Sequence, residues 1–566
     1  MEARLRKSNY RLIAVLLIAQ PFITMFQANI VRDIQFLGLS IFEVFNILVV
    51  GISVCITIYT FKEKKKFIKY IPYLLALGIY IVLHGMNIYV FNNEVYSLQQ
   101  PSFLIETYYI VRTFIVPIML LFSVYYSGMK KDQMINIFRA FIIIVAGSMV
   151  ITNMFGIAQQ NYAEELTYCN NTIFNWFSFE NPFKYSYYDI TTKGWFLSGN
   201  QMSAILFMTY PLTLYIAYTK KQKIDYLTAL AQGLAMFMLG TKVANVGSLI
   251  ILGMFLIFWI VTKIVRKPTN SILFLVIIAV VLGGIFPYSP IGHKIEYEKL
   301  NTTEESVTTT EEPIITIEES VTTTEEPIIT TEEPITTTEE SVTTIEEPIT
   351  MLQGALSAEG DESSTFDYAG LRSDSEILIE LDADNLTEAE KKFVRRYLYN
   401  WCSYFGIAEF IISHYDDLSH MEFWVHYLQE TPNNDYRVLK TMILEDIYQA
   451  NNNPKDKYLG MGYTLNYIYT ESDYTYQIYL YGYIGFILLI GPYFIALFCL
   501  AIRVIKKLKD MFEIETMSLC VGPLLGLLVA KFSGHVFERT FPLLIIAFLL
   551  GIALEHVQEV KSEIEV

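Results

Sequence analysis

A few basic side chains stand in segments that are otherwise apolar or acidic, and their surroundings make them candidates for chemistry. Lys242 falls within a long apolar stretch, Arg112 lies about one turn inside another, and Arg539 closes a short turn between two more. Arg372 is the single basic residue of the acidic segment 301–390. Guanidinium and ammonium groups donate charge-assisted hydrogen bonds to phosphate oxygens. If these four side chains converge, they would hold a diphosphate group.

Two carboxylates form a second candidate group. Glu471 and Asp473 precede an apolar run, beyond a glycine-rich approach that begins at Gly460. A carboxylate at this point could act as the general base for a sugar hydroxyl. The alternative is a polar helix N-terminus, where acidic residues favour the helix dipole without any chemistry.

Each cation also has a plain structural interpretation. Arg539 could reach lipid headgroups, and Arg112 could pair with Glu106 inside the bundle. Arg372 could be an ordinary solvated loop residue. Lys242 is the hardest to explain in this way, because an ionisable group at membrane depth costs at least about 2–3 kcal/mol unless it faces a cavity or a partner.

The elements that must position these residues are membrane helices. The chain has 566 residues, of which 53% are hydrophobic and 17% charged, and its mean hydropathy is +0.36. Twelve apolar runs are long enough to cross ~30 Å of hydrocarbon, and we predict an all-α polytopic membrane protein of about twelve transmembrane helices. The runs cover 10–29, 41–61, 69–91, 108–127, 135–157, 195–218, 225–241, 243–263, 271–288, 475–504, 516–534 and 539–556. The adjoining runs 225–241 and 243–263 could instead form one re-entrant pair.

Lysine and arginine mark every second connection, beginning with the N-terminus. The other connections, 92–107, 159–194 and 289–474, are neutral or acidic. The positive-inside rule places basic connections in the cytoplasm. We therefore expect a multi-pass protein of the plasma membrane with both termini cytoplasmic. The large loop between the ninth and tenth helices is then external.

The external loop divides into two parts. Residues 302–350 repeat a seven-residue Thr/Glu/Pro unit seven times. The prolines of the repeat, and glutamates that have no lysine or arginine to pair with, exclude a coiled coil. We therefore predict a disordered linker over 289–350. Residues 351–474 are predicted to form a helical cap, which leaves 1–288 and 475–566 to the membrane.

Segment 301–390 holds 25 acidic residues and one basic residue, whereas the rest of the chain holds 33 acidic and 40 basic residues. The net charge of −17 therefore describes mainly this loop.

Within the cap, Thr387 and Glu390 have the spacing of a capping box that opens an amphipathic helix. Trp401 and its aromatic neighbours could stack on sugar rings or simply form the core of the cap. Cys169 and Cys402 both fall on the predicted external side, where a disulfide could join them.

Several classes of function are excluded or disfavoured. Five cysteines are too few for a disulfide scaffold or a cysteine-based zinc domain, and no dinucleotide, P-loop or zinc-protease motif occurs. We therefore expect no cofactor and no metal. The net negative charge of the chain gives no reason to expect a nucleic-acid partner.

The order of the short motifs resembles the O-antigen ligase and polymerase superfamily of bacterial surface-polysaccharide assembly. The motifs are Gly194–Asn200 at the entry to the sixth span, followed by Tyr210-Pro211-Leu212; Leu239-Gly240-Thr241-Lys242; Gly370-Leu371-Arg372-Ser373; and Gly460-x-Gly462 followed by Glu471-Ser472-Asp473 and Gly482-Tyr483-Ile484-Gly485. The resemblance implies a substrate-binding role for Asn200. It also implies a metal-independent transfer of glycan from undecaprenyl diphosphate, with the bilayer and other polysaccharide-assembly proteins as partners.

One departure from that pattern matters. Ligases of the superfamily usually carry a His-Asn pair where this chain has Glu471-Ser472-Asp473. The difference, together with the Gly-Thr-Lys motif, resembles capsular or exopolysaccharide polymerases of low-GC Gram-positive bacteria. We therefore expect a polymerase of lipid-linked repeat units. A ligase is the first alternative. A flippase or a membrane scaffold is less well supported, because the two halves of the chain show no similarity.

Overall fold

The structure is a computed structural model of the whole chain. It describes residues 1–30, 35–36, 39–90, 101–161, 167–169, 172–178, 190–265, 269–296, 381–382, 386–387, 389–394, 425, 440–441, 444–445, 448–449, 451–462, 470, 472–506, 513–532 and 534–564. By its internal contacts the chain divides into two units, Met1–Thr302 with Asn433–Val566, and Thr303–Pro432.

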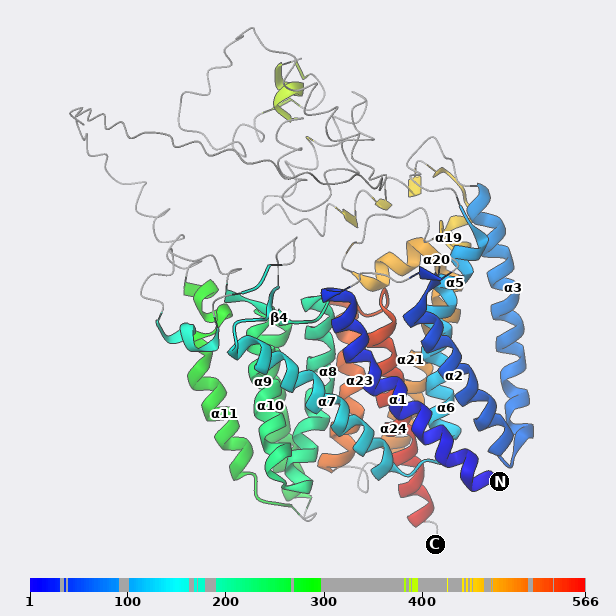
Figure 1. Cartoon of the computed structure of the whole chain (residues 1–566). Coiled ribbons are helices and arrows are strands. Elements are labelled where there is room, and N and C mark those ends of the chain that lie inside the picture. Colours follow the sequence, from blue (N-terminus) through cyan, green and yellow to red (C-terminus); the bar gives the residue numbers. More distant parts are fainter. Residues whose placement is uncertain are drawn as a thin grey trace, which may run out of the picture. The chain divides into compact units, whose positions relative to one another are not determined.

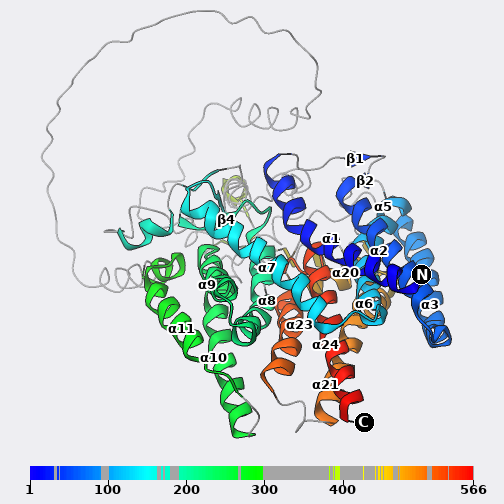
Figure 2. The same cartoon turned by 60° about the horizontal axis from the view of Figure 1, so that its bottom comes forward.

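The first unit is a bundle of long helices, shown in two views in Figures 1 and 2. The helices are α1 (Glu2–Asn29), α2 (Ile41–Thr60), α3 (Ile71–Asn87), α5 (Phe103–Ile110), α6 (Val116–Tyr126), α7 (Lys131–Met154), α8 (Gly199–Lys220), α9 (Lys223–Met238), α10 (Lys242–Ile264), α11 (Leu273–Ile285), α19 (Asp456–Leu459), α20 (Asp473–Leu489), α21 (Gly491–Lys506), α23 (Ile514–Phe532) and α24 (Thr540–Ile564). A π-helix, Val111–Ile115, joins α5 to α6.

Strands are few and short. β1 (Gln35–Phe36) pairs antiparallel with β2 (Leu39–Ser40), and β3 (Gln159–Gln160) pairs antiparallel with β4 (Thr192–Gly194). These two small ladders lie in connections between helices. The all-α fold class predicted from the sequence is therefore confirmed.

All twelve predicted spans are helical. Among the described residues, ten helices are long and apolar enough to cross a membrane, and the bent pair Leu273–Tyr288 with Pro290–Glu296 would make eleven. The twelfth predicted span is α9, which has 16 residues and is therefore about 24 Å long. It packs beside α7 and α8, and whether it spans the membrane or forms a re-entrant pair with α10 stays a prediction.

Two helices form the centre of the bundle. In the most apolar stretch of α24, 94% of the residues are buried, and in that of α8 the share is 83%. In α2 it is 28%. Helices that are apolar all round are typical both of buried cores and of membrane spans. The outer faces, which expose residues such as Leu74 and Ile79, have the composition of a surface that meets lipid.

The basic connections gather at one end of this bundle. Arg6 at the start of α1 donates to the carbonyl of Thr60 at the end of α2. Lys131 at the start of α7 pairs with Glu515 and lies beside His556 near the end of α24. The first and last helices therefore have their terminal ends on the same side as the basic turns. The assignment of this side to the cytoplasm stays a prediction.

Most of the second unit lies outside the described residues, including the heptad repeat, Arg372 and Trp401. The described part includes the predicted capping box. The main-chain N–H of Glu390 donates to Oγ1 of Thr387, and the N–H of Thr387 donates to Oε2 of Glu390. The helix that follows buries Phe393 and Val394. The start of this amphipathic helix is therefore confirmed.

Candidate functional site

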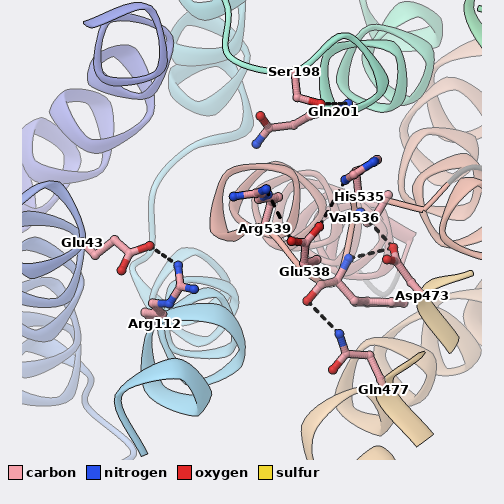
Figure 3. Close-up of polar contacts among 11 residues, drawn as sticks. Glu43, Arg112, Ser198, Gln201, Asp473, Gln477, His535, Val536, Glu538 and Arg539 are labelled. Carbon is pink, nitrogen blue, oxygen red and sulfur yellow. Dashed lines mark hydrogen bonds and ion pairs between the residues drawn. The ribbon is translucent and has the colours of Figure 1, made fainter. Parts of the chain in front are cut away.

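At the end of the bundle opposite the basic turns, charged residues from three segments come together. Figure 3 shows Arg112 from the π-helix, Glu43 from the start of α2, and Glu538 and Arg539 from the turn before α24. The polar ends of Arg112, Glu538 and Arg539 face a common region, toward which Gln201 of α8 also points. The structure thus brings together two of the four cations that the sequence singled out.

Arg112 is placed by an irregularity in its helix. Pro117 has no N–H to donate to the carbonyl of Thr113, and the segment just before it widens into the π-helix. Breaks of this kind often accompany functional sites. Arg112 pairs with the Glu43 carboxylate and stacks 4.7 Å from the centre of the Tyr109 ring.

The predicted alternative partner of Arg112 was Glu106. In the structure the carboxylate beside Arg112 is that of Glu43, which also accepts a 2.6 Å hydrogen bond from the Tyr108 hydroxyl. Glu106 lies against His84, with 2.9 Å between Oε1 and Nε2. Arg112 therefore links two helices that are far apart in the sequence.

The turn before α24 carries a compact group of charges. Oε2 of Glu538 lies 3.1 Å from Nδ1 of His535, and Oε1 lies 3.4 Å from Nη2 of Arg539. The Glu538 side chain is 13% exposed and that of Arg539 is 44% exposed. One carboxylate thus faces an imidazole on one side and a guanidinium on the other.

The electrostatics of this turn favour ionised Glu538. Burial alone would raise the pKa of the Glu538 carboxyl, but the charge of Arg539, the hydrogen bond with His535 and the charge of Arg112 together lower that pKa below its ordinary value. Of the two arginines, Arg539 is the one that contacts the carboxylate, and its charge has the larger effect on that pKa.

Asp473 holds this turn in place. It is the first residue of α20 and is fully buried. Its Oδ2 accepts the main-chain N–H groups of Val536 at 2.8 Å and Phe537 at 2.9 Å. Gln477, one turn further along α20, donates to the carbonyl of Phe537. The proton-accepting role predicted for Asp473 stays untested, and the observed geometry is that of a residue that orients the turn.

The glycine-rich motifs explain how α20 reaches this position. Gly482 breaks α20 with a φ of 63° and a ψ of 178°. The break frees carbonyls that a continuous helix would satisfy, and the segment after α19 replaces those bonds. The N–H groups of Met461 and Gly462 donate to the carbonyls of Tyr479 and Leu480.

Only glycine fits this junction. A Cβ at Gly460 would lie 2.1 Å from the carbonyl oxygen of Leu480, and one at Gly482 would lie 2.3 Å from the carbonyl carbon of Tyr458. Both residues also have positive φ. The predicted motif is therefore a close backbone crossing, which we call the glycine crossing (residues 458–462 against 479–482).

Buried polar groups of α3 fasten the glycine crossing to the bundle. Nδ1 of His84 lies 2.6 Å from the carbonyl oxygen of Leu459, and the Tyr80 hydroxyl donates to the carbonyl of Tyr481 at 2.8 Å. Asn87 donates to Oδ1 of Asp456 and to the carbonyl of Gly460. The end of the large loop is thus tied to a membrane helix.

Lys242 and Asn200 lie at the starts of two neighbouring helices. Gly240 ends α9 with a φ of 68°, and Thr241 caps α10 by accepting the N–H of Ala244. Thr241 also hydrogen-bonds Ser203 near the start of α8, with 2.7 Å between the hydroxyl oxygens. Lys242 is exposed, and Asn200 is partly exposed in the first turn of α8.

Other predicted site residues fall outside the described residues. These are Arg372, Glu471, Trp401 and, for the disulfide, Cys402. Their predicted roles therefore stay predictions.

Sequence reasoning missed the carboxylates. Glu43 and Glu538 do not stand out as site residues in the sequence, because positive-inside topology makes external cations conspicuous but gives no such signal for anions. Glu43 is an acidic residue within an apolar run, and an ionisable residue in a span is itself a signal of function. His535, Glu538 and Arg539 are close in sequence, but their pairing depends on the turn.

A separate group lies at the basic end of the bundle. Ligand atoms of Glu513, Glu515 and His556 lie within 4.8 Å of one another, and the two glutamates also line a cavity of about 310 Å³. Lys131 lies 2.8 Å from Glu515 and already supplies a cation there. We therefore assign no metal to this group.

Comparison with known proteins yields one match. The profile of a family described as "O-antigen ligase like membrane protein" matches residues 7–559, which is nearly the whole chain. No curated protein matches the chain significantly. No solved structure does so either.

Proposed function

Since this chain belongs to the family of O-antigen ligase like membrane proteins, and is thus a membrane enzyme of surface-polysaccharide assembly, we propose that it polymerises oligosaccharide repeat units carried on undecaprenyl diphosphate. An acceptor sugar hydroxyl attacks the anomeric carbon of the donor glycan. The bond from that carbon to the diphosphate breaks, and undecaprenyl diphosphate leaves. The product is a capsular, exopolysaccharide or O-antigen-type chain.

The observation that carries this proposal is that the side chains of Arg112 and Arg539 face a common region at one end of the bundle (Figure 3). A leaving diphosphate gains negative charge as the glycosidic bond breaks. Guanidinium groups held in place before the reaction stabilise that charge most effectively. Lys242 and Arg372 are proposed as the further cations of the diphosphate site.

The remaining predicted residues belong to the acceptor side of this proposal. Asn200, in the first turn of α8, and Trp401 would contact sugar. Glu471 or Asp473 is the predicted general base, and the geometry around Asp473 supports a positioning role instead. No metal or cofactor takes part in the proposed reaction.

The main alternative is a ligase that transfers a finished glycan to another acceptor, as the description of the family would suggest. The two functions differ in what accumulates when the gene is deleted. Loss of a polymerase leaves single repeat units on the lipid carrier. Loss of a ligase leaves long polymer on that carrier.

The test uses a deletion strain complemented with the wild-type gene or with Arg112→Ala or Arg539→Ala. Each variant removes charge-assisted hydrogen bonds worth about 1.5–3 kcal/mol, so we expect the amount of polymer formed per unit time to fall by about tenfold or more. Polymer length and amount are measured on gels, with membrane protein levels matched by immunoblotting.

Lys531→Ala is the matched control. Lys531 is an exposed cation at the end of α23 that stacks near Phe532, and we expect its loss to leave the polymer unchanged. Normal polymer in both arginine variants would refute the proposed diphosphate site. Long polymer on the lipid carrier of the deletion strain would identify a ligase.

A further inference from the structure

The cations of the candidate site have anionic partners within the protein itself. Arg112 pairs with Glu43, and Arg539 lies 3.4 Å from Glu538. A diphosphate that arrived at this arrangement would meet carboxylates beside both guanidinium groups. It can gain the full interaction with an arginine only if a carboxylate gives that arginine up.

Glu538 is better placed than Glu43 to give up its arginine. Glu43 is anchored twice, by Arg112 and by the Tyr108 hydroxyl. The contact of Glu538 with Arg539 is the longest ion pair of this site, and Arg539 is the more exposed of the two guanidinium groups. Glu538 keeps a second partner, His535, when Arg539 moves away.

The backbone around His535 is held independently of the ion pair. Gly534 and His535 both have positive φ, 64° and 60°, and a non-glycine residue adopts this conformation rarely unless its surroundings impose it. Asp473 supplies that restraint through the N–H groups of Val536 and Phe537. The turn can therefore exchange side-chain partners without losing its shape.

We propose that Glu538 is an exchangeable stand-in for a substrate phosphate: it neutralises Arg539 when no donor is bound, yields that arginine to the diphosphate of the donor, and then supports His535 as the group that takes the proton of the acceptor hydroxyl. This inference rests on the proposed function. It makes removal of the proton depend on a bound donor.

The reaction then proceeds in a defined order. With Nδ1 facing Glu538, the acceptor proton passes to Nε2 of His535. The hydroxyl oxygen forms its bond to the anomeric carbon, and the electron pair of the broken carbon–oxygen bond goes to the diphosphate. His535 returns the proton to solvent. A carboxylate that faces Nδ1 of an imidazole stabilises the imidazolium formed in this way.

Glu538→Gln tests the exchange, because it removes the competing charge and also the support of His535. Binding of undecaprenyl diphosphate to purified protein in nanodiscs should tighten by about tenfold, while polymer formation should slow by about tenfold or more. A residue with a merely structural role would not improve binding. Unchanged or weaker binding by Glu538→Gln would overturn the exchange.

His535→Gln separates the proton-transfer step. We expect undecaprenyl diphosphate to bind as in the wild type and the rate of polymer formation to fall. His293→Gln, on the segment after α11, is the matched control and should keep the wild-type rate. A wild-type rate in His535→Gln would refute its role.

Failure of this inference can be told apart from failure of the proposed function. If Arg112→Ala and Arg539→Ala lose polymer but Glu538→Gln does not bind the diphosphate more tightly, the diphosphate site stands and the exchange is wrong. If wild-type protein does not bind undecaprenyl diphosphate, the proposed function itself fails. Glu538→Asp keeps the charge, so wild-type affinity in this variant would confirm that charge governs binding.

Discussion

At the scale of single residues, Glu538 shows how one carboxylate can serve three neighbours. Its carboxylate is largely buried and contacts both Arg539 and His535. The positive charge of Arg112 also lowers its pKa. An acidic side chain that is ionised under such conditions stabilises the fold only while it remains charged. The stability of the protein should therefore report on its titration.

The lowered pKa of Glu538 predicts a pH effect on stability with a definite sign. The unfolded chain takes up the proton near the ordinary value of 4.5, whereas the folded protein resists it to lower pH. Stability contributed by Glu538 is therefore present above about pH 5 and lost as the pH falls below that value. Thermal unfolding in detergent should show a steeper acid loss for the wild type than for Glu538→Gln.

The opposite outcome would contradict this prediction. If Glu538→Gln and the wild type lose thermal stability in parallel below about pH 5, Glu538 is not held ionised by its neighbours. The variants Arg539→Ala and His535→Gln should each remove part of the difference, because each removes one cause of the lowered pKa.

Residue types predicted the cations of the site better than its anions. Arg112 and Arg539 stood out because positive-inside topology gives no reason for a basic residue there. Their partners could not be predicted, because Glu43 and Arg112 are separated by 69 positions. Which carboxylate meets which guanidinium is decided by helix packing and not by spacing in the sequence.

At the scale of elements, the glycine crossing positions the site. It breaks α20 at Gly482 and satisfies the freed carbonyls with N–H groups of residues 461–462. A helix interrupted at membrane depth is tolerated when other protein groups complete its hydrogen bonds. The break sets the direction of the first half of α20 and hence the place of Asp473.

Gly482→Ala should therefore loosen the crossing. The substitution forces a positive φ on alanine, which costs roughly 1–2 kcal/mol, and places a Cβ against the backbone of Tyr458. We expect the melting temperature in detergent to fall by roughly 3 °C or more.

Gly78→Ala is the matched control for this change. Gly78 lies within α3, and a Cβ there would have no neighbour within 4 Å, so stability should be unchanged or slightly higher. Equal melting temperatures for Gly482→Ala and the wild type would contradict the role of the crossing.

At the scale of the whole molecule, the ends of the bundle have opposite chemistry. Basic turns cluster around Lys131 and Lys220 at one end, and the candidate site lies at the other. The segment at the end of the large loop, residues 456–462, packs at the end of the bundle that holds the site.

Topology can be checked by labelling single cysteines in a background without native cysteine. Lys242→Cys should react with a membrane-impermeant thiol reagent in intact cells, whereas Lys221→Cys should react only after permeabilisation. Both side chains are exposed in the structure, so accessibility of the protein surface is matched. Labelling of Lys221→Cys in intact cells would reverse the predicted orientation.

The membrane architecture follows from the amino-acid sequence alone, because hydrocarbon demands long apolar helices wherever the chain crosses it. The motif glycines, Arg112 and Arg539 also stand out in the sequence. The roles of these residues depend on the packing of the helices. Charge pairs and close backbone crossings join segments that are distant along the chain, and their energy depends on three-dimensional contact. Thus Glu43 was found as the partner of Arg112, and Glu538 as the centre of the site, only when the helices were packed.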